Sequence, residues 1–148
     1  FFQDARYHFI APLQSRKLKF ISQNFETIHT LQRKKEVDLL AKFKTNNTTF
    51  LQINIDNDIN KTGLKVDNLF NMFEYCLENS IIPVGLMTIP NINSDPKYVF
   101  SELSKLNETL KKNYHQYKGE LSMGMSDDYQ IALDYGATIV RIGTKLFK

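Results

Sequence analysis

Apolar residues gather in short, strand-like runs that recur along the chain. The runs cover residues 6–13, 26–31, 48–55, 81–89, 119–124 and 137–147. Each is predominantly apolar and often β-branched, which is typical of strands that are buried on both faces.

Helical patterns lie between these runs. In residues 66–79 and 97–114 the apolar side chains fall on one helical face, and the segment after Arg33 has the same spacing. Residues 127–135 predict one more helix. Alternating strands and helices predict a parallel sheet.

Several residues are expected to mark the ends of these helices. Asp67 is predicted to cap one helix, and Asp95 with Pro96 reads as the N-cap and first position of another. Gly119 and Gly136 are expected where helices stop.

The sheet has two possible architectures. With about six strand–helix units and no Gly-rich dinucleotide motif after the first strand, it is either doubly wound or part of an eight-stranded barrel. A complete barrel typically needs about 250 residues. Because the chain has 148 residues, we expect one domain over residues 1–148 and, for a barrel, an incomplete one.

Composition narrows the class of protein. The chain is 42% hydrophobic and 24% charged, with a net charge of +3, which suits a globular protein. Its basic residues occur in short groups among the helices, so nucleic acid is not the expected partner. A single cysteine, together with the lack of a signal peptide or a bilayer-length apolar run, favours the cytoplasm and no membrane contact.

A polar loop superficially resembles a calcium-binding loop. Asp56, Asp58 and Asn60 alternate, and Asp67 follows at the twelfth position. Calcium is not expected, because Lys61 occupies the position where the sharp turn needs glycine and the last ligand should be glutamate. The segment is interpreted as a loop after a barrel strand, on the face where such folds bind ligands.

Other reactive side chains have ordinary explanations. Cys76 lies on the apolar face of a helix, which indicates a core residue. His29 is embedded in a strand and His115 is expected at the surface. The chain shows no metal-ligand spacing, serine elbow or P-loop.

The last two strand ends carry the strongest candidate site. Ser126 follows one run, and Gly143 with Thr144 follows the next. In barrels, the loops after the seventh and eighth strands often hold a phosphate through backbone N–H groups and a hydroxyl. Ser126 could instead be only a helix N-cap, because Asp127 and Asp128 beside it would repel a dianion.

Arg141 favours the phosphate-pocket interpretation. It alternates with Val140 and Ile142 inside an apolar strand, so its side chain is expected to point into a barrel or cleft. A buried guanidinium needs an acceptor. The alternative is an ion pair with a carboxylate in the core.

Three stretches carry a family resemblance: "HFIAPLQSRK", "GLMTIP" and "LSMGMSDDYQIALDYGATIVRIGTKLF". They resemble the pyridoxal phosphate homeostasis proteins, small single-domain relatives of the alanine racemase barrel, and the match extends through nearly all of the chain. The resemblance implies an α/β fold: a partial TIM (β/α)8 barrel of the alanine racemase N-terminal type that lacks about the first two βα units. It also implies pyridoxal 5'-phosphate (PLP) as the cofactor.

The resemblance also implies roles for individual residues. The Ser126 hydroxyl and the Gly143–Thr144 backbone would hold the phosphate, Met123 would belong to the cofactor-binding set, and Arg141 would face the pyridine nitrogen. Arginine stays protonated in proteins, so that nitrogen must accept and remains unprotonated, which weakens the ring as an electron sink. Such a site is suited to holding PLP rather than using it in a reaction.

The implied function is non-enzymatic PLP homeostasis. Similar proteins are thought to bind PLP and hand it over, so PLP-requiring apoenzymes are the expected partners and a monomer is expected for the full-length protein. The alternatives are a PLP-dependent amino-acid racemase-like enzyme and an inactive remnant.

The chain departs from the family at several positions. Its first strand corresponds to about the third of eight, so the family's Schiff-base lysine and Gly-Glu-Asn segment are not in this chain, and we expect an N-terminally truncated sequence. Lys17 and Lys61 match other family positions. Ala11 and Lys148 stand where the family commonly has glycine.

Overall fold

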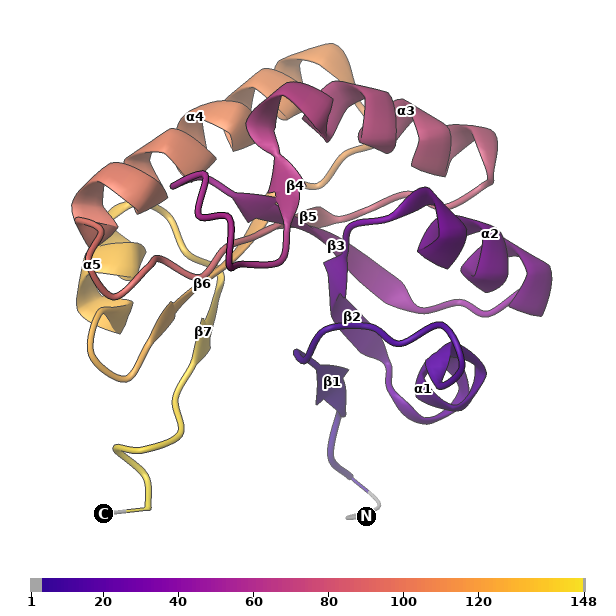
Figure 1. The fold of residues 1–148 in the computed structure, drawn as a ribbon, viewed down its shortest axis with the longest axis horizontal. Helices are drawn as coiled ribbons and strands as arrows, with labels where there is room; N and C mark the ends of the chain where they lie inside the picture. Colours follow the sequence, from indigo (N-terminus) through magenta and orange to yellow (C-terminus); the bar gives the residue numbers. More distant parts are fainter. Residues whose placement is uncertain (1–3, 148) are drawn as a thin grey trace.

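Strands and helices alternate along the computed structural model, which describes residues 4–147 (Figure 1). The strands are β1 (His8–Phe9), β2 (Thr27–Leu31), β3 (Thr48–Asn54), β4 (Leu64–Lys65), β5 (Gly85–Met87), β6 (Glu120–Met125) and β7 (Ile139–Arg141). The helices are α1 (Leu18–Asn24), α2 (Lys34–Phe43), the 3-10 turn η1 (Val66–Asn68), α3 (Leu69–Glu78), α4 (Pro96–Asn113) and α5 (Tyr129–Asp134).

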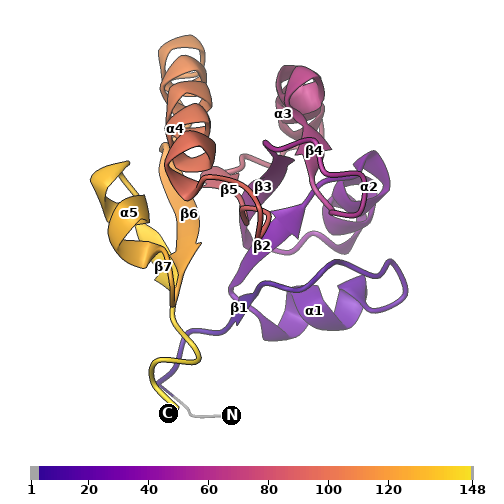
Figure 2. The same ribbon diagram turned by 60° about the vertical axis from the view of Figure 1, so that its left-hand side comes forward.

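All strand pairs are parallel, as the sequence predicted. The sheet order is β1-β2-β3-β5-β6-β7, and the short β4 pairs with β3 beside this path. The sheet curls, with its helices along the outside of the curve (Figures 1 and 2). The main path follows the chain order without the reversal that defines a doubly wound sheet, and β1 and β7 each have one neighbouring strand within residues 4–147, so the fold is a partial barrel.

The longest helix shows how local sequence sets an element. Asp95 caps α4 by accepting a hydrogen bond from the Lys97 N–H, and Pro96 occupies the first turn, both as predicted. In its apolar stripe, Val99, Leu103 and Leu110 are fully buried and Leu106 is partly buried. The helix is therefore fixed by a cap at one end and by packing along its inner face.

The predicted roles of two residues at helix ends are wrong. Asp67 does not cap a helix: it lies inside η1, and neither η1 nor α3 has a side-chain cap hydrogen bond. Gly119 does not end α4, which stops at Asn113; its φ of +80° instead turns the chain into β6. Gly136 follows α5 as predicted, with φ +88° and its N–H donating to the Leu133 carbonyl.

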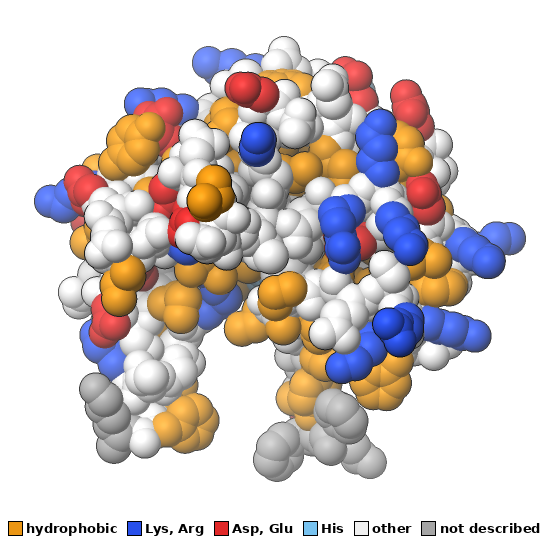
Figure 3. Space-filling model, viewed as in Figure 1, with side chains coloured by type: hydrophobic (Ala, Val, Ile, Leu, Met, Phe, Trp, Pro, Cys, Tyr) orange, Lys and Arg blue, Asp and Glu red, His pale blue; other side chains and the backbone are white. Residues whose placement is uncertain are grey.

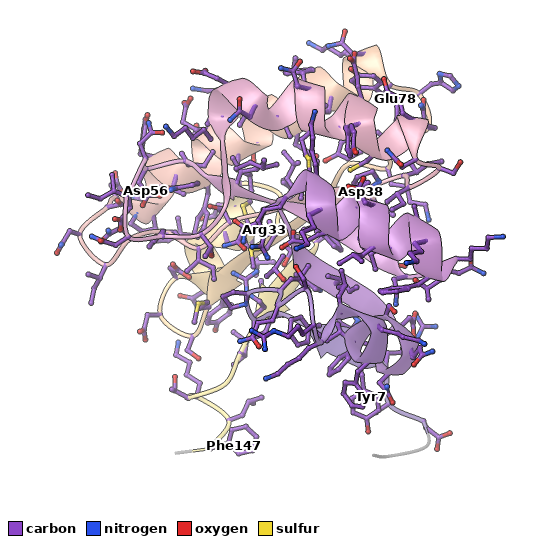
Figure 4. The ribbon with its side chains drawn as sticks, turned by 45° about the vertical axis from the view of Figure 1, so that its right-hand side comes forward. Tyr7, Arg33, Asp38, Asp56, Glu78 and Phe147 are labelled. Atoms are coloured by element: carbon purple, nitrogen blue, oxygen red, sulfur yellow. The ribbon has the colours of Figure 1, made fainter. Side chains whose placement is uncertain are left out.

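The start of α2 depends on a buried carboxylate. Glu36 is fully buried and accepts hydrogen bonds from the backbone N–H groups of Gln32 and Arg33. Its other oxygen accepts from the Arg33 Nε, 2.7 Å away. Arg33, labelled in Figure 4, lies where the chain enters α2. This carboxylate therefore satisfies donors that the helix itself leaves unpaired.

One core holds these elements together. Most of the buried apolar residues form a single cluster that draws on β2, β3, β5 and β6 and on all five α-helices. Every residue of β2 is buried, as expected for a parallel strand covered on both faces. No helix within residues 4–147 is long and apolar enough to cross a bilayer.

Figure 3 shows that this face of the molecule is hollowed at its lower edge, between the segments that carry the two chain ends. Hydrophobic side chains lie at the top of the hollow, while Lys and Arg side chains are more numerous toward the side of α1 and α2. The curl of the sheet thus leaves a concave inner surface between its two ends.

Candidate functional site

A cavity of about 590 Å³ lies within the curl, between the two ends of the sheet. Its volume falls in the usual range for small-molecule sites. The lining comes from β1 and β2, from the ends of β5 and β6, and from β7: His8, Ile10, His29, Ile89, Met125, Ile139, Val140, Arg141, Ile142 and Gly143. Much of it lies at the carboxyl ends of the strands, where parallel barrels place their sites.

The two turns of the expected phosphate site meet in the structure. The Gly143 N–H donates to the Ser126 Oγ over 3.3 Å, and Ser126 is buried. The N-cap position of α5 is Asp128, and the hydroxyl of Ser126 bonds to Gly143 rather than to this helix. The interpretation of Ser126 as only a helix cap is therefore not supported.

The backbone at Gly143 is open on one side. A Cβ atom placed on Gly143 would meet nothing within 4 Å. The turn that follows is closed by the Leu146 N–H donating to the Gly143 carbonyl, and the exposed Thr144 lies within it. Lys145 Nζ lies 4.8 Å from the centre of the Tyr129 ring and so links this turn to α5. A ligand group could therefore approach this backbone closely.

Arg141 points into the interior of the curl, as predicted. Its Nη1 donates to the Ser122 Oγ over 2.7 Å, and its Nη2 donates to the Thr88 carbonyl over 3.0 Å. Both acceptors are neutral, and Arg141 has no ion pair within residues 4–147. The alternative of a core ion pair is therefore not supported.

The electrostatics of Arg141 follow from its burial. Burial lowers the pKa of Arg141 from 12.5 to about 10, while the negative charge of Asp128 opposes this shift. The Asp128 carboxylate itself accepts a hydrogen bond from the Met125 N–H at the end of β6. Arg141 therefore keeps its positive charge at neutral pH, and no carboxylate of the described residues forms an ion pair with it.

A buried histidine extends this arrangement. His29 Nδ1 lies 2.8 Å from the Ser122 Oγ, and His29 Nε2 lies 2.9 Å from the His8 Nδ1. The His29 ring stacks on Phe50 with a centroid distance of 4.6 Å. Burial, with smaller contributions from His8 and Arg141, lowers the pKa of His29 from 6.5 to about 4, so the ring is neutral at pH 7.

Sequence reasoning missed part of this site. It noted His29 only as a strand residue and did not single out His8 or Ser122. The available signal was that His29 and Ser122 are polar residues within strongly apolar runs, which demands a partner for each of them.

The structure places Met123 away from the cavity. Met123 is fully buried in the core cluster, while Met125 is 45% exposed and lines the cavity. Successive strand residues point to opposite faces, so Met123 faces away from its neighbour Ser122, which bonds to Arg141. A direct role for Met123 with a cofactor stays a prediction.

The other candidate residues have structural roles. In the loop after β3, Asp56, labelled in Figure 4, accepts hydrogen bonds from the Asn91 N–H and the Ser94 hydroxyl. Lys61 Nζ donates to the Ile89 carbonyl beside the cavity. Within residues 4–147, no group of three or more His, Cys, Asp or Glu side chains could hold a metal ion.

The predictions for cysteine and for the surface histidine are confirmed. Cys76 is fully buried on the inner face of α3, and burial raises its pKa to about 12, so it is a core residue and a poor nucleophile. His115 lies at the surface after α4.

Comparison with curated proteins identifies close relatives. The chain is 40% identical over 152 residues to the pyridoxal phosphate homeostasis protein of Aquifex aeolicus, covering 97% of this chain and 67% of that protein. It is 37% identical to the Vibrio cholerae protein of the same name, of which it spans 63%, and 34% identical to the Synechocystis one, of which it spans 71%. These names describe homeostasis rather than a catalysed reaction. No family model matches the chain.

Solved structures agree with the curated relatives. PipY of Synechococcus elongatus without PLP superposes with a TM-score of 0.89 at 26% identity, covering 99% of this chain and 73% of PipY. PipY with PLP bound superposes with a TM-score of 0.84 at 25% identity, covering 98% of this chain and 71% of PipY. An arginine decarboxylase from Paramecium bursaria Chlorella virus shares the fold, with a TM-score of 0.71 at 18% identity. The chain therefore belongs to the pyridoxal phosphate homeostasis protein family, with the partial TIM-barrel fold of the alanine racemase type that its sequence predicted.

Proposed function

We propose that this chain binds PLP and serves PLP homeostasis as a cofactor-binding protein. The observation that carries the proposal is Arg141, a charged guanidinium that faces the cavity and whose hydrogen-bond partners among residues 4–147 are both neutral. Such a group is stabilised by a ligand that accepts a hydrogen bond or carries negative charge. The names of the curated relatives and the PLP bound to PipY support the same ligand.

The residues present fit PLP. The Ser126 hydroxyl and the backbone of Gly143 and Thr144 would hold the phosphate, since the two turns already meet and the space beside Gly143 is open. Arg141 would donate a hydrogen bond to the pyridine nitrogen. Met123 would support the β6 strand from its buried outer face.

This arrangement favours storage over catalysis. Bound PLP supplies an aldehyde and an electron-accepting ring. Arg141 stays protonated, so it donates to the ring nitrogen and leaves that nitrogen without a proton, which weakens electron withdrawal. The proposed role is therefore to hold the cofactor, not to activate amino acids.

Further parts of the proposal concern the cellular setting. The protein would act in the cytoplasm as a monomer and release PLP to PLP-requiring apoenzymes. We propose that it acts as one domain, because its elements share a single core cluster.

Titration calorimetry with three ligands tests the proposed site. PLP and pyridoxine 5'-phosphate should both bind saturably, and pyridoxal, which lacks the phosphate, should bind at least about tenfold more weakly. Pyridoxine 5'-phosphate has no aldehyde, so its binding cannot come from reaction with surface lysines. Equal affinity for pyridoxal would refute the phosphate site, and the absence of saturable binding would indicate an inactive remnant.

A separate measurement distinguishes binding from catalysis. Incubation of the protein with PLP and alanine in D₂O, followed by NMR, should show no protein-dependent exchange of the α-hydrogen. Exchange above the rate with free PLP would favour the racemase-like alternative.

A further inference from the structure

Four polar side chains connect one end of the sheet to the other across its concave face; His29 and Ser122 are fully buried, while His8 is exposed at one end. His8 on β1 contacts His29 on β2, His29 contacts Ser122 on β6, and Ser122 accepts from Arg141 on β7. The three separations are 2.9, 2.8 and 2.7 Å. We call this set the interior relay. It connects both ends of the sheet and finishes at the residue assigned to the cofactor ring.

The central contact of the interior relay depends on the curl. β2 and β6 are separated in the sheet by β3 and β5. In a flat sheet, three strand spacings of about 4.8 Å would hold them about 14 Å apart. The 2.8 Å contact between His29 and Ser122 therefore forms across the concave face and couples the curvature of the sheet to Arg141.

The donors and acceptors of the interior relay have a definite direction. A guanidinium only donates, so the Ser122 oxygen must accept from Arg141. Ser122 is fully buried, and its own proton needs an acceptor, which is the Nδ1 of His29. His29 then carries its proton on Nε2 and donates it to the His8 Nδ1.

This order of hydrogen-bond donors and acceptors requires the His29 ring to be neutral. A protonated His29 would place an N–H against the Ser122 hydroxyl and a positive charge near Arg141. Burial and these neighbours lower the pKa of His29 to about 4, which agrees with the neutral form.

We propose that His29 and Ser122 are positioning residues that orient Arg141, so that its remaining N–H groups favour a ligand whose ring atom accepts a hydrogen bond. His8 completes the set by accepting from His29 and fixing its tautomer. The inference rests on the proposed binding of PLP and adds the residues that determine selectivity for its ring nitrogen. With the interior relay interrupted, Arg141 loses its bond to Ser122 and, in the described part of the chain, keeps the Thr88 carbonyl as its one hydrogen-bond partner, so its guanidinium can adopt other orientations.

The test compares PLP with its 1-deaza analogue, in which carbon replaces the ring nitrogen. The unaltered protein should prefer PLP by about tenfold or more, as expected for a charged donor facing an acceptor. His29→Phe keeps an aromatic ring that can stack on Phe50 but removes both hydrogen bonds. We expect this variant to lower the preference to about two-fold or less, because a misplaced donor no longer distinguishes the ring atoms.

Two further variants sharpen the comparison. Ser122→Ala breaks the interior relay at the residue that bonds to Arg141 and should produce the same loss of preference, with no further loss when it is combined with His29→Phe. His115→Phe makes the same change at an exposed histidine outside the relay and should leave the preference unaltered. A general loss of stability would weaken binding of both ligands alike, so the ratio of the two affinities isolates positioning.

The tautomer of His29 provides a test that needs no variant. Nitrogen-15 NMR of the unaltered protein at pH 7 should show His29 protonated on Nε2 and unprotonated on Nδ1. The opposite tautomer, or a protonated ring, would overturn the inference even if His29→Phe failed to fold.

The outcomes separate this inference from the proposed function. If the unaltered protein binds PLP and its deaza analogue equally, the contact between Arg141 and the ring nitrogen is wrong. If the unaltered protein prefers PLP over the deaza analogue and the variants His29→Phe and Ser122→Ala keep the same preference, only the positioning inference fails. If it binds neither, both proposals fall.

Discussion

His29 should make the protein sensitive to mild acid. Its pKa is about 4 in the folded protein against an ordinary value of 6.5, so the unfolded chain takes up the proton first as the pH falls. Stability therefore decreases with falling pH between these two values, with the full loss reached below pH 4. Integration of this difference predicts a loss of about 2 kcal/mol between pH 7 and 5, and about 3 kcal/mol over the whole window.

Urea unfolding of the unaltered protein and of His29→Phe at pH 7, 6 and 5 measures this loss. The carboxylates are the same in both proteins, so the difference between their pH profiles isolates His29. The unaltered protein should lose about 2 kcal/mol more than the variant between pH 7 and 5. Parallel profiles for the two proteins would refute the assignment of a buried, neutral His29, whatever the absolute stability of the variant.

Three more predictions concern the site and the fold. Arg141→Glu should weaken PLP binding more than tenfold in calorimetry, because it places a negative charge near the ring and the phosphate; unchanged affinity would overturn the placement of Arg141. Ser126→Ala should weaken PLP binding by about three- to tenfold while affinity for pyridoxal stays the same, and equal losses for both would contradict a phosphate contact. Glu36→Ala should lower the free energy of unfolding in urea by about 3 kcal/mol, since it removes the acceptor of the Gln32 and Arg33 backbone N–H groups before α2 and leaves the Arg33 guanidinium with the Leu13 carbonyl but no carboxylate; a loss below about 1 kcal/mol would contradict this role.

Much of the fold could be predicted because buried parallel strands have a strong pattern. The run at residues 48–55 contains β3, the run at residues 119–124 covers β6 except its last residue, Met125, and the helical stripe in residues 97–114 coincides with α4 to within one residue at each end. The short α1 was not predicted: its seven residues carry few apolar positions from which a helical period could be recognised. Asp67 was misjudged because a 3-10 turn precedes α3, and that choice depends on tertiary packing.

The site was predictable only where strand order determines it. Ser126 and Gly143 follow neighbouring strands, so the sequence could bring them to the same edge of the sheet. The contact between His29 and Ser122 joins residues 93 positions apart on strands that are not neighbours. Only the degree of curl brings them together, and hydrophobic periodicity carries no information about curl. The direction of Met123 has a different cause: Ser122 takes the inner face of β6, so the next residue along the strand faces the buried core.

Backbone amide NMR of the unaltered protein during titration with pyridoxine 5'-phosphate tests the central claim most directly. This ligand carries the phosphate and the ring nitrogen of PLP but cannot react with lysine. We expect saturable shifts of the Ser126, Gly143 and Thr144 amides and of the Arg141 side-chain N–H signals, all with one dissociation constant. Saturable shifts confined to other residues, or no saturable shift at all, would contradict the proposed cofactor site.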